Sequence, residues 1–470
     1  MYFRLGLMLF LLLAAQELCR AQNKHNLTDT SSFYIVDTIR LEGNRLTHPS
    51  VIRRELPFKD GDTLPGNQLW QLCKQSHDNL MNTALFNFVD IDTLLNKESH
   101  ISVVIRMKER WYIWPFPIFE ISDRNFNSWL EKGDLSRINY GLYLVIDNFR
   151  GRKESLKFLL RFGFDQKYSF SYTKPNLDRR HRLGIGFTTG YGRNHTTSYL
   201  SQDNKQLFFR SENRYAVQNF YQGVQLTYRK GLYMKHTMNL YFDNYRFVDS
   251  IYLLNNSFCG IRDPMFFTLY YKFEWDRRDY ITYPLNGYYL NVEAEKKGLG
   301  LIRGKEIDLL SLKASYRHYW NLDTRWFFAA GIFTKFSHSG IPAYFAEQGL
   351  GFGSETIRSM EYYVIDGQHY GMVKTQLKYQ LLKTKIINLK FLPLSKFNRI
   401  PVAFYLNLYY DGAYVSENRQ DMMTTLNNNY IYGGGIGLDF VTYYDQVIRL
   451  EYSMNMMREH GFFLHFTAPF

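Results

Sequence analysis

The chain has 470 residues, with 57 Lys and Arg against 44 Asp and Glu, and a formal net charge of +13. Aromatic residues make up 18%, which is typical of aromatic-rich strands or membrane girdles. This composition excludes a disordered chain and a coiled coil, and only three cysteines exclude a disulfide framework. The positive charges are scattered between aromatics, so no nucleic-acid partner is expected.

The N-terminus predicts export. An apolar run over residues 5–15 is too short to span a bilayer as a helix. The small residues before and at Ala21 favour cleavage there, so residues 1–21 are predicted to be a secretory signal peptide. A lipoprotein signal acylated at Cys19 is the weaker alternative.

After a linker at residues 22–33, the segment 34–110 predicts a small α+β domain. Its patterns change from period two to helical spacing and back. The expected order is β-α-α-β-β, with a strand at 34–41, a short helix near 51–56, a helix at 67–84, and strands at 88–94 and 101–107.

This element order resembles a POTRA domain of the outer-membrane assembly proteins. The residues that carry the resemblance are Gly43-Asn44, Gly61-Asp62, Asn79-Leu80 before Leu85-Phe86, and Glu109-Arg110. A three-stranded sheet covered by two helices leaves an edge strand, which can accept an extended client or partner segment by β-augmentation. The alternative is that the domain is a passive spacer.

Residues 112–470 predict a mainly β region, a transmembrane antiparallel β-barrel. The alternating segment 156–165 has one wholly apolar face and one largely polar face. A soluble sandwich alternates too, but similar segments recur along the whole region. At about 22 residues for each strand with its connection, the region holds about sixteen strands. The polar stretches 196–215 and 416–429 are expected to be outer loops.

A first motif lies in the middle of the barrel region. Asp276, Arg278 and Asp279 end a strand, and a turn with Pro284 and Gly287 follows. This pattern resembles the strand-turn-strand signature of the surface-antigen barrel in the BamA and TamA superfamily. Proline fixes the turn, and glycine permits a close entry to the next strand.

A second motif contains Arg358, Glu361 and Asp366 and resembles the tip of the long loop that folds into the barrel lumen in this superfamily. The resemblance implies that Arg358 anchors the loop to acidic residues on the inner wall. A guanidinium inside a narrow lumen needs bidentate carboxylate partners. The candidate partners are Asp411 and Asp439, on late strands whose alternation can point them inward.

The loop tip departs from the family pattern. Ser359 and Met360 stand where the superfamily has glycine and an aromatic residue. If the tip needs a positive φ, serine adopts it only at a cost in free energy. The tip conformation is therefore left open by the sequence.

The end of the chain resembles the assembly signal of outer-membrane barrels. Gly461, Leu464 and Phe466 fit its pattern, and the terminal Phe470 is aromatic. A last strand must pair with the first to close a barrel. Pro469 would weaken the ladder there, and by analogy with membrane insertases the resemblance implies a seam that opens easily.

No motif carries catalysis, so the sequence predicts no enzyme, no metal site and no cofactor. The resemblance implies a factor for protein assembly, insertion or translocation in a Gram-negative outer membrane, with the POTRA-like domain in the periplasm. Its partners would be outer-membrane lipid, unfolded β-barrel or exported client polypeptides, and accessory periplasmic or lipoprotein subunits. A two-partner-type secretion pore is the alternative, and a passive porin or adhesin is less favoured.

Overall fold

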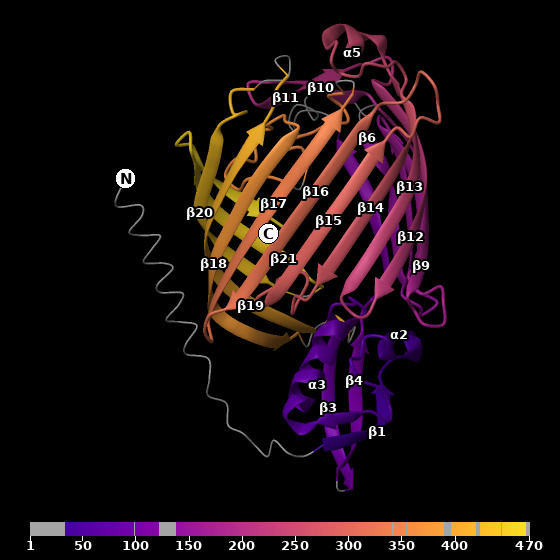
Figure 1. Cartoon of the computed structure of the whole chain (residues 1–470), viewed down its shortest axis with the longest axis vertical. Helices are drawn as coiled ribbons and strands as arrows, with labels where there is room; N and C mark the ends of the chain where they lie inside the picture. Colours follow the sequence, from indigo (N-terminus) through magenta and orange to yellow (C-terminus); the bar gives the residue numbers. More distant parts are fainter. Residues whose placement is uncertain are drawn as a thin grey trace.

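The computed structural model describes residues 33–97, 99–121, 138–340, 343–353, 355–389, 396–419, 424–442 and 444–466. The predicted signal peptide at 1–21, nearly all of the linker at 22–33, and Phe470 lie outside the described residues. Two bodies follow in chain order, a small domain below and a barrel above (Figure 1).

The small domain is a four-stranded sheet with two helices. Its elements are β1 (Phe33–Glu42), α2 (Pro49–Arg53), β2 (Thr63–Pro65), α3 (Gly66–Met81), β3 (Phe86–Lys97) and β4 (His100–Glu109). The sheet order is β2-β1-β4-β3, with β1 and β4 parallel. The expected three-stranded sheet therefore has a fourth strand, β2, which is too short to show alternation and ends at a proline.

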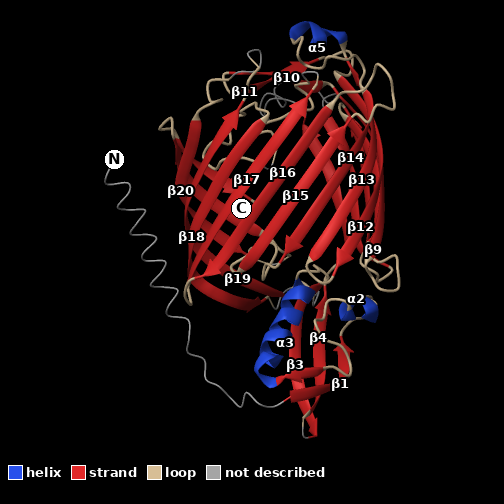
Figure 2. Cartoon of the chain, in the orientation of Figure 1, coloured by secondary structure: helices blue, strands red, loops and turns tan. Residues whose placement is uncertain are grey.

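The core of this domain lies between its helices and the sheet. Helix α3 turns Leu80 inward, and Leu69 and Leu72 pack beside it, as the three-and-four spacing predicts. The opposing sheet contributes Val103 and Ile105, both fully buried. Within the described residues, the α-helices lie in this domain and at the far end of the barrel (Figure 2).

Among the described residues, sixteen strands form one antiparallel sheet, which confirms the predicted fold class and strand number. The barrel strands are β5 (Ile113–Ile121), β6 (Ile138–Phe149), β7 (Glu154–Gly163), β8 (Gln166–Lys174), β9 (Leu183–Asn194), β12 (Val217–Lys230), β13 (Met234–Phe247), β14 (Met265–Asp276), β15 (Gly287–Lys297), β16 (Leu309–Asn321), β17 (Trp326–Ser339), β18 (His369–Asn388), β19 (Arg399–Ser416), β20 (Tyr430–Val441), β21 (Val447–Asn455) and β22 (His460–His465).

The barrel wall is apolar outside and polar inside. On β19, Leu408 and Tyr410 are exposed outward, whereas Asn407, Tyr409 and Asp411, which alternate with them, are buried inward. This period-two alternation is the arrangement of a membrane barrel with lipid outside and polar groups in the lumen. Separately, no helix in the described part of the chain is long and apolar enough to cross a membrane.

The barrel end away from the small domain carries extra structure. The stretch 196–215, expected to be an outer loop, contains a β-hairpin of β10 (Thr196–Gln202) and β11 (Lys205–Arg210). Helix α5 (Asp249–Leu254) lies at the same end (Figure 1). Aromatic side chains such as Phe258 and Tyr344 pack these segments together, because a hairpin alone has too little apolar area to be stable.

Candidate functional site: the lumen loop and the barrel seam

The turn between β14 and β15 holds the first motif. The Arg278 guanidinium binds the Asp276 carboxylate, with Nη2 2.6 Å from Oδ2. Asp279 Oδ1 accepts hydrogen bonds from the backbone N–H groups of Tyr280 and Leu285, at 2.8 and 3.1 Å. Burial raises the pKa of the Asp279 carboxyl, although these backbone N–H groups oppose the shift. The motif is therefore a rigid turn held by its own acidic side chains.

The shape of this turn depends on Gly287. The turn also lies where the small domain contacts the barrel. Gly287 has a φ of 103°, and a Cβ there would collide with a backbone carbonyl across the turn. Pro284 is buried in the same turn. Asn82 of the small domain donates to the carbonyl of Asp279 at 3.0 Å and accepts from the N–H of Ile281 at 2.9 Å. The motif thus docks the small domain onto the barrel.

Two partly buried ion pairs reinforce this docking. Arg229 on β12 binds Glu55 through two N–O contacts of 2.6 Å. Arg110 Nη2 lies 3.0 Å from Asp445 Oδ1 in the turn between β20 and β21. Burial by itself would raise the pKa of Glu55, but the hydrogen bonds and charge of Arg229 hold that pKa below its usual range.

The lumen loop, residues 343–368 without 354, joins β17 to β18 and carries the second motif. Arg358 Nε and Nη2 donate to the two oxygens of Asp411 at 2.9 and 2.5 Å. The backbone N–H of Arg358 also donates to Asp411, at 3.1 Å, and Nη2 reaches the carbonyl of Thr375 at 3.2 Å. The guanidinium stacks 4.0 Å from the ring centre of Tyr409. The structure therefore brings Arg358 together with one of its two candidate partners.

The other candidate partner, Asp439, is bound by Arg449 instead. The two residues are directly opposite in the β20–β21 ladder, and Arg449 Nη2 lies 2.8 Å from Asp439 Oδ2. Tyr283 and Asn407 donate to the same carboxylate at 2.7 and 2.8 Å. Asp439 thus belongs to a second buried pair, which lies beside the apolar cluster of Tyr283 and Val447.

The tip of the lumen loop contains a residue with a left-handed backbone conformation, although that residue is not a glycine. Ser359 has a φ of 76°. Its hydroxyl is buried and has no hydrogen-bond partner among the described residues. Met360 packs with Ile357 and Leu350 in the apolar cluster between the loop and the wall. Serine therefore carries the strain that glycine would avoid.

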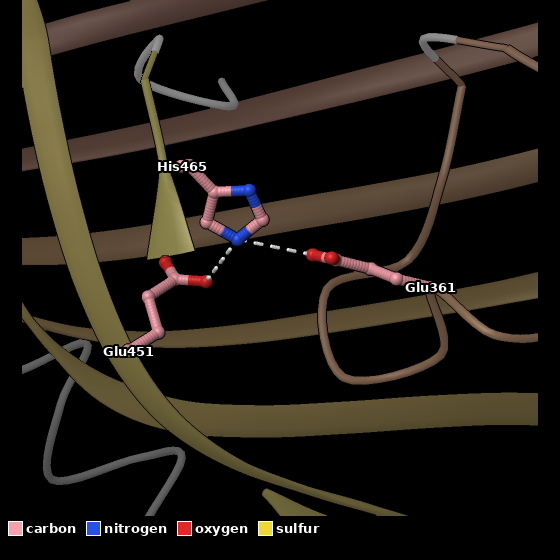
Figure 3. A group of neighbouring side chains, drawn as sticks. All are labelled: Glu361, Glu451 and His465. Atoms are coloured by element: carbon pink, nitrogen blue, oxygen red, sulfur yellow. Dashed lines mark ion pairs between the residues drawn. The ribbon is translucent and has the colours of Figure 1, made fainter. Parts of the chain in front are cut away.

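The remaining acidic residues of the motif have separate surroundings. Glu361 faces the last strand, with its Oε1 3.1 Å from Nε2 of His465, and Glu451 Oε2 lies 3.3 Å from the same nitrogen (Figure 3). Asp366 is buried at the other end of the loop, and burial raises its pKa to about 6. Asp366 is therefore not part of the Arg358 pair.

The last strand places its apolar side chains outward. In β22, Phe462 and Leu464 are 72% and 57% exposed, and Phe466, directly after the strand, is 64% exposed. Gly461 lies opposite Ser453 in the β21–β22 ladder. These side chains face the surroundings of the barrel, as an assembly signal in a lipid-facing strand would.

The barrel sheet has two free edges. Its order runs from β22 at one end to β5 at the other, and among the described residues no ladder pairs β5 with β22. The first strand, β5, contains Pro115 and Pro117. We call the junction between β5 and β22 the seam.

The two prolines face the seam. In an antiparallel ladder, alternate residues bond to one neighbour and the residues between them point to the other side. The β5–β6 pairing is continuous from Ile113 to Ile121, and proline has no N–H. The residues that bond to β6 are therefore those at the positions that alternate with the prolines. Pro115 and Pro117 turn their nitrogens to the free edge.

Sequence reasoning did not single out several of these residues. Strand β5 was not singled out, because a proline within a run counts against a strand. Prolines at alternate positions are nevertheless a signal of an edge strand. Arg449 and His465 are single polar residues in alternating strands. Alternation predicts that both face the lumen, but it does not say what they meet there.

Comparison with known proteins agrees with this architecture. The family model for the POTRA domain, described as the surface antigen variable number repeat, matches residues 34–110. The structure of CdiB from Escherichia coli is 12% identical with a TM-score of 0.52, covering 92% of this chain and 75% of that chain. BamA from Haemophilus ducreyi lacking POTRA domains 1–3 is 15% identical with a TM-score of 0.48, covering 92% and 83%. No curated protein sequence matches the chain.

The chain is therefore a β-barrel protein with a POTRA domain at residues 34–110. Its fold, from the POTRA domain to the barrel, is shared with CdiB. The resemblance predicted from the sequence is confirmed in fold and domain order.

Proposed function

We propose that this protein is a Gram-negative outer-membrane factor that receives an extended polypeptide at its periplasmic POTRA domain and inserts it into the membrane at the seam. The proposed activity transfers a polypeptide and includes no enzymatic step. The observation that carries the proposal is the free edge of β5, where Pro115 and Pro117 stand without N–H groups.

The prolines weaken closure of the barrel. Inside a bilayer each backbone group without a partner costs several kcal/mol, so a closed barrel normally pairs its first and last strands. Here β5 offers two fewer donors to β22, and the gain from closure is smaller. A client strand with a full set of N–H groups is a better partner for β22 than β5 is. Exchange of partners at the seam then becomes favourable for a client.

The POTRA domain has an edge that suits a client. Strand β3 is twelve residues long and lies at the end of the sheet, with only β4 as a neighbour in the sheet order. Leu94 and Leu95 are exposed there. A long edge strand can bind an extended segment through its backbone, largely independent of the client's sequence. Accessory periplasmic or lipoprotein subunits would compete for the same kind of surface.

A two-partner-type secretion pore is the second candidate, and the fold shared with CdiB favours it. Such a pore threads its polypeptide through the lumen. The lumen loop and its buried Arg358–Asp411 pair stand on that route, so threading needs a displacement that transfer at the seam does not. We therefore rank insertion at the seam first.

The test is depletion of this protein in its native host, followed by quantitative outer-membrane proteomics. Insertion predicts a fall in many β-barrel proteins, whereas secretion predicts loss of one or a few exported proteins. An unchanged proteome contradicts both and leaves a porin or adhesin.

Complementation adds the structural control. A Pro115→Ala/Pro117→Ala variant restores two donors at the seam, and we expect it to complement poorly. Pro401→Ala removes a strand proline in β19, away from the seam, and should complement fully. Equal complementation by both variants would show that the activity does not depend on the prolines at the seam.

A further inference from the structure

We propose that Glu361, Glu451 and His465 form a binding site for one divalent transition-metal ion, such as Zn²⁺. The three side chains come from the lumen loop, β21 and β22, and they point toward one another (Figure 3). Histidine nitrogen and carboxylate oxygen are ligands that Zn²⁺ takes in proteins. The site would join the lumen loop to the last strand of the barrel.

The distances between the donor atoms suit such an ion. His465 Nε2 lies 3.1 Å from Glu361 Oε1 and 3.3 Å from Glu451 Oε2. Donor atoms around a tetrahedral Zn²⁺ are about 3.3 Å apart when each bond is about 2.0–2.1 Å. All three donors lie within 4.8 Å of one another. A small rotation of Glu361, which sits on a loop, completes the geometry.

Two atoms of the group are buried and form no hydrogen bond with the described residues. Within the described chain, His465 Nε2 and Glu451 Oε1 are buried atoms with no hydrogen-bond partner. The ring nitrogen therefore points between two carboxylates without being aligned on either. Glu451 is fully buried, and buried polar atoms without partners are uncommon in folded proteins.

Neighbouring residues position Glu451 for a single bond to the ion. Arg449 Nη1 lies 3.4 Å from Oε1, on the oxygen that does not face His465. The Tyr409 hydroxyl approaches Oε2 at 3.5 Å. The positive charge of Arg449 opposes a cation, but Asp439 pairs with that arginine. Two carboxylates then remain to balance the charge of the ion.

The site has access and room for a further ligand. Glu361 and His465 line a lumen cavity of about 740 Å³. Water from this cavity can take the open coordination position. Binding displaces the proton that Nε2 carries when the imidazole is charged, so affinity should rise with pH.

A bound ion would strengthen the hold of the lumen loop on β22. Arg358 and Asp411 anchor the loop to β19, and the ion would add a second attachment, between the loop and the last strand. This consequence for seam opening rests on the proposed function. Metal binding itself does not, and the two are tested separately.

The experiment is isothermal titration of ZnCl₂ into the full-length protein in detergent micelles at neutral pH. We expect one Zn²⁺ per chain. His465→Ala and Glu361→Gln should each weaken binding about tenfold or more. Glu361 lies on the loop, so its variant tests the site even if His465→Ala fails to fold. His460→Ala, on the same strand but outside the site, is the matched control and should bind as the unchanged protein does.

Two results would overturn the proposal. One is an unchanged protein that binds no Zn²⁺. The other is Glu361→Gln and His465→Ala variants with unaltered affinity and stoichiometry, which would place any bound ion at another histidine. Neither result depends on client insertion, so failure of this site and failure of the proposed function are distinguishable.

Discussion

Arg358 on the lumen loop and Asp411 on β19 form a bidentate ion pair in which neither side chain is exposed. Two charges removed from water stabilise a fold only when their geometry is good and their other atoms are satisfied. Here the backbone N–H of Arg358, the carbonyl of Thr375 and the ring of Tyr409 add further contacts to the pair. The pair therefore sets where the loop lies in the lumen.

Breaking this pair should be costly. We expect Asp411→Leu alone to destabilise the barrel by about 3–5 kcal/mol, because it leaves the Arg358 guanidinium buried without a counter-charge. Arg358→Met combined with Asp411→Leu removes both charges and should recover most of that loss. The measurement is the unfolding free energy in micelles, arranged as a double-mutant cycle. Simple additivity of the two single changes would show that the residues do not act as a pair.

Ser359→Gly should stabilise the loop. Relief of the left-handed strain should raise the free energy of unfolding by about 1–2 kcal/mol. The greater entropy of glycine in the unfolded chain should offset about 0.5–1 kcal/mol of this gain. We expect a rise in the temperature at which the barrel unfolds on a heated gel. Ser315→Gly, at a buried serine in β16 with ordinary φ, should lower it. A fall for both variants would mean that the strain at Ser359 is small.

Restoring N–H groups at the seam should protect it. Each new ladder bond contributes about 0.5–1.5 kcal/mol, so Pro115→Ala/Pro117→Ala should slow hydrogen exchange in residues 113–121 and 460–465. Pro401→Ala is the control and should leave these segments unchanged. Exchange that stays fast in the double variant would indicate that the prolines do not limit pairing of β5 with β22.

Docking of the POTRA domain should weaken in acid. Because Arg229 holds the pKa of Glu55 below its usual range, the stabilisation is complete above the unfolded pKa of about 4.3. It is lost as the pH falls through the lower folded value. We expect faster hydrogen exchange in the β14–β15 turn below about pH 4, measured by mass spectrometry.

A variant isolates the group responsible. Glu55→Gln should make the turn exchange faster at neutral pH, and it should remove this part of the acid dependence. Asp60→Asn is the control, because it breaks the ion pair between Asp60 and Arg53. Both side chains of that pair are more than 40% exposed, and such surface pairs contribute only about 0–1 kcal/mol. If Asp60→Asn had the larger effect, the Glu55–Arg229 pair would not be what docks the domain.

Local patterns in the sequence were sufficient for the barrel and the POTRA domain. Period-two alternation places side chains on opposite faces of a strand whatever its neighbours are, so the sixteen-stranded wall followed from counting. Arg358 was recognised by the resemblance of its segment to the lumen-loop tip of the superfamily, and the need of a buried guanidinium for an acidic partner then pointed to the late-strand carboxylates. The patterns failed where an element was short or unusual, as with β2, β5 and the hairpin of β10 and β11.

Only the tertiary structure decided which polar residues meet. Asp411 and Asp439 both point into the lumen, and the sequence left both as partners of Arg358. The ladder register places Asp439 opposite Arg449, whereas the fold of the lumen loop brings Arg358 to Asp411.

The same is true of Glu361, Glu451 and His465, which are too far apart in sequence to show a metal-ligand spacing and which only the fold brings together. Alternation determines the face on which a side chain lies, because it depends on the backbone alone. Register and loop path depend on packing across the whole barrel, so they determine the neighbours of that side chain.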